Sequence, residues 1–439
     1  GSQSFNGTSG NDVFIGASGV DTVTTGTGVD VVLTWGGDDV ITVDGTGSKT
    51  ISGGAGTDSL TISSASNLGS FTSISRTADT ADAIYTLTYS NGDTISYDGI
   101  ETLKVGSSVY QNMGGIGDNR GYFWNGTEAK FYLYTTGSSG ANMISEHVDG
   151  GTGFSASTAL GIEGSAGADN INFNVDRSST LTAAVTLNTG AGNDSISSGK
   201  WINSDSIDLG SGDDFISMMI SGSSGTPSFS SANFTKLDGG SGIDTLNFEE
   251  GTSDGTTLSL SFGGAVNFEN LGGSGAADTI NGDGGNNFIW GGGGADTING
   301  GAGNDTLHGK NKSYSGAGDS NQDDSANNTL NGDAGDDTLI TGNGADTLDG
   351  GTGADSITTG SGADTIIVRV GDGGSTLAAA DTITDFTDGT DVLSLDGSLT
   401  YSDLTIAQGT GSNSSDTIIS AGSEYLTILK GISASNINY

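Results

Sequence analysis

An apolar residue returns at every ninth position in long stretches of the chain, each time at the centre of a short strand-like segment. Numbered from its first glycine, a nine-residue unit has glycine at most of positions one, two and four, an acidic or amide residue at position six, and the apolar residue at position eight. The clearest of these apolar residues are Val23, Val32, Ile41, Ile298, Leu307, Leu339, Leu348, Ile357 and Ile366. The pattern predicts three-residue strands that send one side chain inward, joined by tight turns.

The residues at position six fall into three blocks. The first block carries Asp12, Asp21, Asp30 and Asp39 and, after a slip of one residue, Asp58. The second, looser block carries Asp169, Asp194, Asp214 and Asp244. The third block carries Asp278, Asn287, Asp296 and Asp305 and, after an insertion at 309–327, Asn328, Asp337, Asp346, Asp355 and Asp364. Regular spacing over consecutive units indicates one repeated structure.

Two units are expected to make one turn of a flattened solenoid, so that each turn stacks on the turn 18 residues away. The predicted stacked pairs are Asp12 with Asp30, Asp21 with Asp39, Asp278 with Asp296, and Asn287 with Asp305. In the later units Asn328, Asp346 and Asp364 share one edge, opposite Asp337 and Asp355. Two residues depart from the pattern and are expected to weaken any site beside them: Lys49 in a position-six slot, and Ala276 at position four before Asp278.

The acidic side chains need more positive charge than the chain itself supplies. The chain has 53 acidic and 12 basic side chains and a formal net charge of -41, and 45 of the acids are aspartate. Aspartate with glycine favours turns over helices. Short carboxylates and turn carbonyls facing one point suit a hard divalent cation, and calcium (Ca²⁺) is the usual choice. A metal-free solenoid of Asn/Asp-Gly turns is the alternative.

The composition also excludes several classes of protein. A chain this acidic would be repelled by a phosphate backbone, which excludes nucleic acid as a partner. No run of about 18 apolar residues occurs, so no membrane span is expected. The absence of cysteine excludes disulfides and thiolate metal sites, and suits a secreted bacterial protein. Low hydrophobicity with high charge is typical of disorder, but the periodicity argues against that interpretation.

Written as G-G-x-G-x-D-x-U-x, the unit resembles the calcium-binding nonapeptide repeat of RTX (repeats-in-toxin) proteins. The resemblance implies an all-β fold, a parallel β-roll or β-helix solenoid that holds several Ca²⁺ ions between successive turns. On this basis we expect a first roll block at 1–62, an irregular β spacer at 63–160, a looser roll block with β insertions at 161–270, a regular roll at 271–375 with its loop insertion at 309–327, and a C-terminal cap and secretion region at 376–439.

The spacers carry strand patterns of another kind. Residues 84–89 and 94–97 alternate around Asn91-Gly92-Asp93, which predicts a β-hairpin. An E-x-L strand follows at 99–105, and a similar one at 266–275; this build resembles large RTX surface-layer proteins. The aromatic segments 120–125 and 131–134 are expected to pack a strand layer, or else to contact sugar or a neighbouring protomer. The insertion at 309–327 is expected to be a polar loop.

Residues 381–397 resemble the C-terminal cap and secretion region of type I secretion substrates. Asp381, Asp385, Asp388 and Asp391 are expected to bind one further calcium there, and the apolar strands that follow should close the open end of the roll. No N-terminal signal peptide is recognisable. Gly1-Ser2 resembles a cloning remnant, so the natural N-terminus is expected to lie elsewhere.

No catalytic pattern stands out, and we expect no enzyme. The only histidines are His147 and His308, without zinc-protease spacing, and no G-x-S-x-G elbow occurs. The outward positions form no regular threonine ladder of the kind that binds ice. Nothing resembles an acylated or pore-forming toxin domain.

The favoured function is a secreted, calcium-binding structural protein that folds and assembles outside the cell, as part of a bacterial surface layer. Its expected partners are calcium, copies of itself and cell-surface polysaccharide. The alternative is a calcium-stabilised adhesin or scaffold module of a larger RTX protein, with a binding function instead of a lattice.

Overall fold

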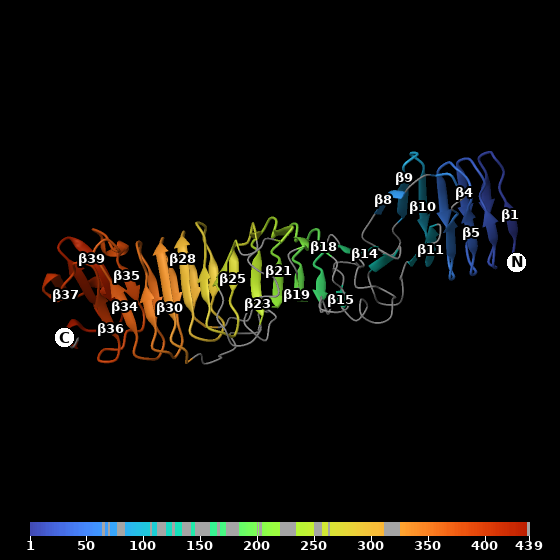
Figure 1. Ribbon diagram of the computed structural model, residues 1–439. Helices are drawn as coiled ribbons and strands as arrows, with labels where there is room; N and C mark the ends of the chain where they lie inside the picture. Colours follow the sequence, from blue (N-terminus) through green and yellow to red (C-terminus); the bar gives the residue numbers. More distant parts are fainter. Residues whose placement is uncertain are drawn as a thin grey trace. The chain divides into compact units, whose positions relative to one another are not determined.

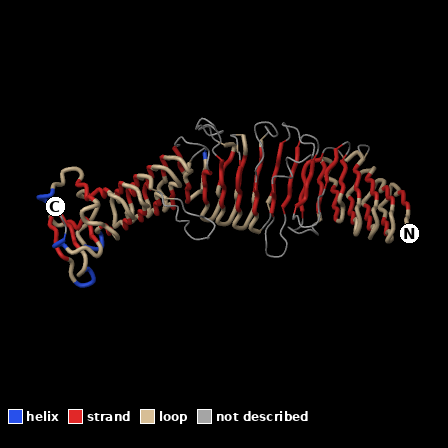
Figure 2. The backbone as a smooth tube through the Cα atoms, turned by 90° about the horizontal axis from the view of Figure 1, so that it is seen from below, coloured by secondary structure: helices blue, strands red, loops and turns tan. Residues whose placement is uncertain are grey.

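The computed structural model describes residues 1–63, 66–68, 71–76, 84–105, 108–111, 120–124, 128–133, 142–144, 159–164, 167–172, 184–199, 201, 204–219, 234–249, 257–261, 264–310 and 325–436. The chain divides into two compact units: residues 1–197 with 204–214, and residues 198–203 with 215–439. Short strands, most of them parallel, succeed one another along each unit, with turns at both edges (Figures 1 and 2).

The first roll places two strands in each turn of the chain. Its strands are β1 (Ser4–Asn6), β2 (Val13–Ile15), β3 (Thr22–Thr24), β4 (Asp30–Leu33), β5 (Val40–Val43), β6 (Lys49–Ser52) and β7 (Ser59–Ile62). The odd-numbered strands form one parallel sheet and the even-numbered strands another, with Val23 opposite Ile41 and Val32 opposite Ile51. These apolar side chains are buried between the two sheets. The predicted stacking of alternate units is confirmed.

An antiparallel hairpin ends the sheet of even-numbered strands. The strands are β8 (Phe71–Arg76), β9 (Tyr85–Tyr89) and β10 (Thr94–Asp98), and β10 also pairs in parallel with β6. Gly92 adopts a φ of 92° in the turn, which glycine tolerates without strain. Tyr85 and Tyr97 stack with ring centroids 5.7 Å apart and join the core of the roll. The predicted hairpin is therefore confirmed, and it is built onto the roll.

The sheet of odd-numbered strands continues through the first E-x-L segment as β11 (Thr102–Val105), paired in parallel with β7 and antiparallel with β12 (Ser108–Gln111). The unit goes on with β13 (Arg120–Trp124), β14 (Glu128–Leu133), β15 (Asn142–Ile144), β16 (Ala159–Glu163), β17 (Asn170–Asn172), β18 (Val185–Asn188), β19 (Ser195–Gly199) and β20 (Ser206–Asp208). The aromatic segments thus form the antiparallel pair β13–β14. The predicted role of their side chains lies outside the described residues, as does His147.

The second unit contains the most regular roll. Its strands are β21 (Phe215–Met219), β22 (Lys236–Asp238), β23 (Thr245–Glu249), β24 (Thr257–Ser259), β25 (Asn270–Gly272), β26 (Thr279–Asn281), β27 (Phe288–Trp290), β28 (Thr297–Ala302), β29 (Thr306–His308), β30 (Thr329–Ala334), β31 (Thr338–Ile340), β32 (Thr347–Asp349), β33 (Ser356–Thr358) and β34 (Thr365–Val368). Strands β28 and β30 pair with Ile298 opposite Leu330, so the insertion leaves the stacking register intact. Most of the polar loop predicted at 309–327, namely residues 311–324, lies outside the described residues.

The C-terminal end of this roll is covered by strands of another orientation. Strands β35 (Asp381–Ile383) and β36 (Val392–Leu395) extend the two parallel sheets, and β37 (Leu404–Gln408), β38 (Thr417–Ala421) and β39 (Glu424–Leu429) form an antiparallel meander attached to β35. Val368, Leu399 and Leu426 are buried together there. The predicted fold class, a parallel roll with β spacers and a β cap, is confirmed.

Candidate metal sites

The position-six side chains form hydrogen-bonded ladders along the edges of the rolls. In each step the Oδ1 atom accepts a hydrogen bond from the backbone N–H of the position-six residue one turn earlier: Asp12 N to Asp30 at 2.9 Å, Asp278 N to Asp296 at 2.8 Å, and Asn287 N to Asp305 at 2.8 Å. The same step joins Asp21, Asp39 and Asp58; Asp169, Asp194 and Asp214; Asp296, Asn328, Asp346 and Asp364; and Asp305, Asp337 and Asp355. The stacked pairs predicted from the spacing are therefore observed.

The second carboxylate oxygen, Oδ2, accepts a backbone N–H at Asp12, Asp21 and Asp278, but it is unsatisfied at other ladder positions. At Asp39, Asp58, Asp305 and Asp337 the Oδ2 atom is buried and has no hydrogen-bond donor among the described residues. A buried acceptor left without a partner is costly, and more so when it is ionised. The oxygen therefore faces a place where a cation would lower the free energy of the fold.

The glycine at position one provides the space beside this oxygen. A Cβ atom added at Gly300 would collide with Oδ2 of Asp305 and approach the carbonyl oxygen of Gly332. A Cβ atom at Gly332 would likewise collide with Oδ2 of Asp337 and with the carbonyl oxygen of Gly350. Carboxylate and carbonyl oxygens thus converge on a cradle that only glycine leaves open.

Burial and mutual repulsion raise the pKa of several ladder carboxylates. Burial, together with the nearby Asp39 and Glu101, raises the pKa of Asp58 to about 6. Burial, together with neighbouring aspartates of the same ladders, raises the pKa of Asp337 to about 7 and that of Asp194 to about 8, although hydrogen bonds from the backbone lower these pKa values. The ionised form of these ladder carboxylates is therefore disfavoured unless a positive charge is supplied.

The donor set fits calcium better than a transition metal. The converging groups are carboxylate, amide and carbonyl oxygens, which hard cations prefer. In the part of the chain that the structure describes, no group of three or more His, Cys, Asp or Glu side chains is placed to hold a metal. Main-chain carbonyls would therefore have to complete each coordination sphere, as the glycine cradles allow.

Three ladder residues were missed in the sequence. Glu101 and Glu269, from the two E-x-L strands, accept the backbone N–H of Asp58 at 2.6 Å and of Asp244 at 2.8 Å, in place of a position-six aspartate. Asp205 is buried and accepts the N–H of Val185 at 2.7 Å. Its spacing of nine residues from Asp214 could have revealed it.

The acidic residues of the C-terminal motif are not all brought to one point. Asp381 accepts the N–H of Asp355 at 3.1 Å, and Asp391 accepts that of Asp364 at 3.2 Å, so the two continue different ladders. Asp385 accepts hydrogen bonds from Thr359 N and Gly360 N. Asp388 lines a cavity of about 390 Å³ in the cap. Asp381 and Asp391 thus extend the two ladders, and the further calcium site expected at the four residues stays a prediction.

Comparison with known families agrees with this geometry. The model of the RTX calcium-binding nonapeptide repeat (4 copies) matches residues 6–41, 174–200, 272–307, 322–357 and 340–373, which include many of the ladder residues. The chain contains RTX calcium-binding nonapeptide repeats. RTX nonapeptide repeats bind calcium, and RTX repeat proteins are typically secreted.

Comparisons with curated proteins and with solved structures give no further assignment. No curated protein matched the chain. Among solved structures, the extracellular lipase LipA from Serratia marcescens aligns at 14% identity and a TM-score of 0.22, over 99% of this chain and 39% of the lipase. The chain thus spans well under half the length of that structure. In the described residues, no helix has the length and apolar character needed to cross a membrane.

Proposed function

We propose that this chain is a secreted structural protein whose RTX rolls fold on calcium outside the cell, and that it forms part of a bacterial surface layer. The observation that carries the proposal is the row of buried carboxylates whose Oδ2 atoms face glycine cradles without a donor among the described residues. Asp12, Asp21, Asp30, Asp39, Asp58 and the later position-six residues would be ligands, except where a side chain of the protein supplies the charge.

Calcium concentration would decide where the chain folds. Sites with affinities of about 0.1–1 mM remain empty at cytosolic calcium and fill outside the cell. With a net charge of -41, the metal-free chain repels itself and stays extended, which suits export through a narrow channel. Because each carboxylate joins two turns, binding at one level orders the next, and the binding free energy becomes folding free energy.

The proposed role is structural and not enzymatic. In the described residues the buried aspartates belong to the ladders or to ion pairs, which leaves them little freedom for acid–base chemistry. His308 lies on β29 with its ring 5.2 Å from that of Phe288, at an ordinary packing position. Calcium binding by the RTX repeats would explain the buried carboxylates without a catalytic role.

Exposed apolar residues on the first roll support assembly with other copies. Val13, Ile15 and Trp35 are 67%, 59% and 68% exposed. Apolar side chains this exposed are common at protein contacts. Several modest contacts of this kind, with calcium bridging the remaining negative charge, would suit a lattice.

The test is a calcium titration of the full chain from chelator to 10 mM, followed by circular dichroism and light scattering, with magnesium as the control. The surface-layer proposal requires a cooperative coil-to-β transition followed by particle growth, with calcium and not magnesium. A transition that stops at a monodisperse monomer would keep the calcium-dependent roll but favour an adhesin or scaffold module. Unchanged β structure in chelator would overturn the calcium mechanism.

A further inference from the structure

Lys49 interrupts a ladder at a buried position. It begins β6, in register with Asp30 on β4, where the spacing of the first roll calls for the next acidic residue after Asp12 and Asp30. Its side chain has 0% of its surface exposed, and that of Asp30 has 2%. A lysine is almost never buried this fully unless its charge is matched, so its surroundings should reveal its role.

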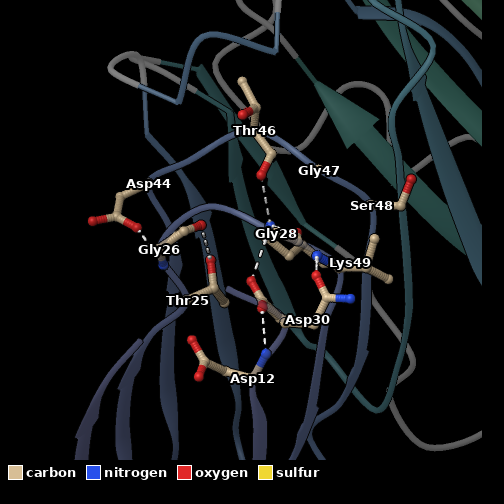
Figure 3. A network of polar contacts seen from close by, with 12 residues as sticks. Asp12, Thr25, Gly26, Gly28, Asp30, Asp44, Thr46, Gly47, Ser48 and Lys49 are labelled. Atoms are coloured by element: carbon tan, nitrogen blue, oxygen red, sulfur yellow. Dashed lines mark hydrogen bonds and ion pairs between the residues drawn. The ribbon is translucent and has the colours of Figure 1, made fainter. Parts of the chain in front are cut away.

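The ammonium group lies among oxygens of two successive turns (Figure 3). Lys49 Nζ is 3.0 Å from Oδ2 of Asp30, and it donates to the carbonyl oxygens of Gly28 at 2.5 Å and Thr46 at 3.0 Å. Two carbonyls thus accept hydrogen bonds from the ammonium group, which has three donors, and the carboxylate matches its charge as an ion pair. These are the same kinds of oxygen that the other levels direct toward their glycine cradles.

The neighbouring ladder shows the contrast. Along both edges of this roll the Oδ2 atoms of the ladder, those of Asp30, Asp39 and Asp58, are buried and accept no hydrogen bond among the described residues. Oδ2 of Asp30 differs in its electrostatic partner, because it forms an ion pair with the ammonium of Lys49 at 3.0 Å. A divalent ion bound among the same three oxygens would lie within a few ångströms of the ammonium and be repelled by it.

We propose that Lys49 is a built-in cation that takes the place of calcium between the turns ending at Asp30 and at Lys49. This level of the first roll would then close without metal, while the opposite edge still requires it. The proposal rests on the function proposed above, because it assigns one level of a calcium-binding ladder to the protein's own charge.

The place of Lys49 in the fold explains why a tethered cation suits it. Beyond β6 this sheet continues into the hairpin, where Ile95 of β10 lies opposite Lys49 and offers no carboxylate. Asp93 of the hairpin accepts the N–H of Gly47 at 2.8 Å, which holds the lysine turn in place. The ladder ends here, because the next turn has Ile95 and no acidic residue at the ladder position.

A second protein cation is surrounded by carboxylates in a related arrangement. Near the C-terminal end of the regular roll, Arg369 pairs with Asp349, Asp372 and Asp396, which come from three successive segments of the roll and cap. Their carboxylates, together with hydrogen bonding to Asp349, raise the pKa of the guanidinium further above its usual range. Protein cations thus pair with carboxylates of successive segments at these two places.

The decisive experiment counts calcium ions bound to the full-length chain by equilibrium dialysis at saturating calcium. Lys49→Asp restores the acid that the repeat pattern expects, and should bind one ion more than the wild type. Lys104→Asp, which makes the same charge change at an exposed position on β11, is the control and should leave the count unchanged. An equal count in wild type and Lys49→Asp, with both proteins folded, would overturn the proposal.

A second variant tests the ammonium group independently of the count. Lys49→Met keeps the length of the side chain but leaves the buried Asp30 carboxylate without its partner, a loss of about a hundredfold or more in the folding equilibrium. Amide hydrogen exchange of 30–33 and 49–52 should speed up accordingly in calcium, while the Lys104→Met control should not change. Equal protection in both variants would count against the lysine. A wild type that binds no calcium would instead refute the proposed function, and Lys49→Met would still report on the ion pair.

Discussion

At the scale of single residues, the two oxygens of a position-six carboxylate have different roles. Oδ1 accepts a backbone hydrogen bond, and Oδ2 faces the cradle. Asn287 and Asn328 occupy the same position, and Asn328 accepts the hydrogen bond of Asp296 N at 2.8 Å. An amide can therefore replace Oδ1 as the acceptor of the backbone hydrogen bond. An amide carries no negative charge, so it is a weaker ligand for a cation in the glycine cradle than a carboxylate Oδ2. Charge and geometry at position six can therefore be tested apart.

Asp305→Asn should keep the hydrogen bond from Asn287 N, which is 2.8 Å long in the wild type, and lose the charge. We expect the roll to fold in saturating calcium, with the midpoint of the calcium titration raised several-fold because one ligand is weakened. Asp305→Ala, which loses both the backbone hydrogen bond and the charge, should lower the free energy of unfolding by about 1–3 kcal/mol more. Asp213→Asn, at an exposed position, is the matched control for the charge. Identical midpoints for all three variants would contradict the ladder as a metal site.

The raised pKa values predict an opposite effect of pH with and without calcium. The pKa values of Asp58, Asp337 and Asp194 are raised to about 6, 7 and 8, above the value of about 4 expected when unfolded. The calcium-free fold then binds more protons than the unfolded chain, so it gains stability as pH falls from about 8 to 5 and loses it as pH rises. Circular dichroism in chelator should show more β structure at pH 5 than at pH 8.

With calcium present the direction reverses. Protons compete with the metal for the same carboxylates, so the midpoint of the calcium titration should move to higher calcium as pH falls. A midpoint that does not change between pH 8 and pH 5 would mean that the titrating groups are not the ligands.

At the scale of the elements, the stacking distance between turns explains the glycine pattern. Gly300→Ala would press a methyl group against Oδ2 of Asp305 and the carbonyl of Gly332. We expect a loss of about 1–3 kcal/mol in the free energy of unfolding, together with weaker calcium binding. Gly284→Ala is the matched control, because a Cβ atom there has nothing within 4 Å. Equal melting temperatures for the two variants would refute the cradle.

Most of the repeated elements could be predicted from the sequence, because spacing alone determines which units stack. The pairs Asp278 with Asp296 and Asn287 with Asp305 followed from a period of 18 residues. Glu101 could not be placed in the same way, since 43 residues separate it from Asp58. Its longer side chain reaches the ladder only because the hairpin and β11 return the chain to the roll.

The burial of Lys49 also lay beyond the pattern. The sequence marks it as a foreign residue in an acidic slot and predicts a weakened site. Whether such a lysine turns outward or inward depends on which oxygens surround it. Only the three-dimensional arrangement shows that Gly28, Asp30 and Thr46 enclose the ammonium.

At the scale of the whole molecule, two explanations of calcium dependence must be separated. Calcium could act by reducing the self-repulsion of a chain with a net charge of -41, or by occupying specific oxygen sites. Screening by 1 M salt reduces interactions between exposed charges beyond about 3 Å, but buried pairs are screened much less. The Oδ2 atoms of Asp39, Asp58, Asp305 and Asp337 are buried, so screening leaves them unsatisfied.

We therefore expect 1 M sodium chloride in chelator to make the unfolded chain more compact without producing β structure. Small-angle scattering and circular dichroism on the same samples would report the two changes separately. Adding 10 mM calcium at constant salt should then produce the full β signal, because only an ion inside the ladder meets the buried oxygens. If salt alone produced that signal, repulsion would be the whole barrier to folding, and the ladders would be a consequence of the fold instead of its metal switch.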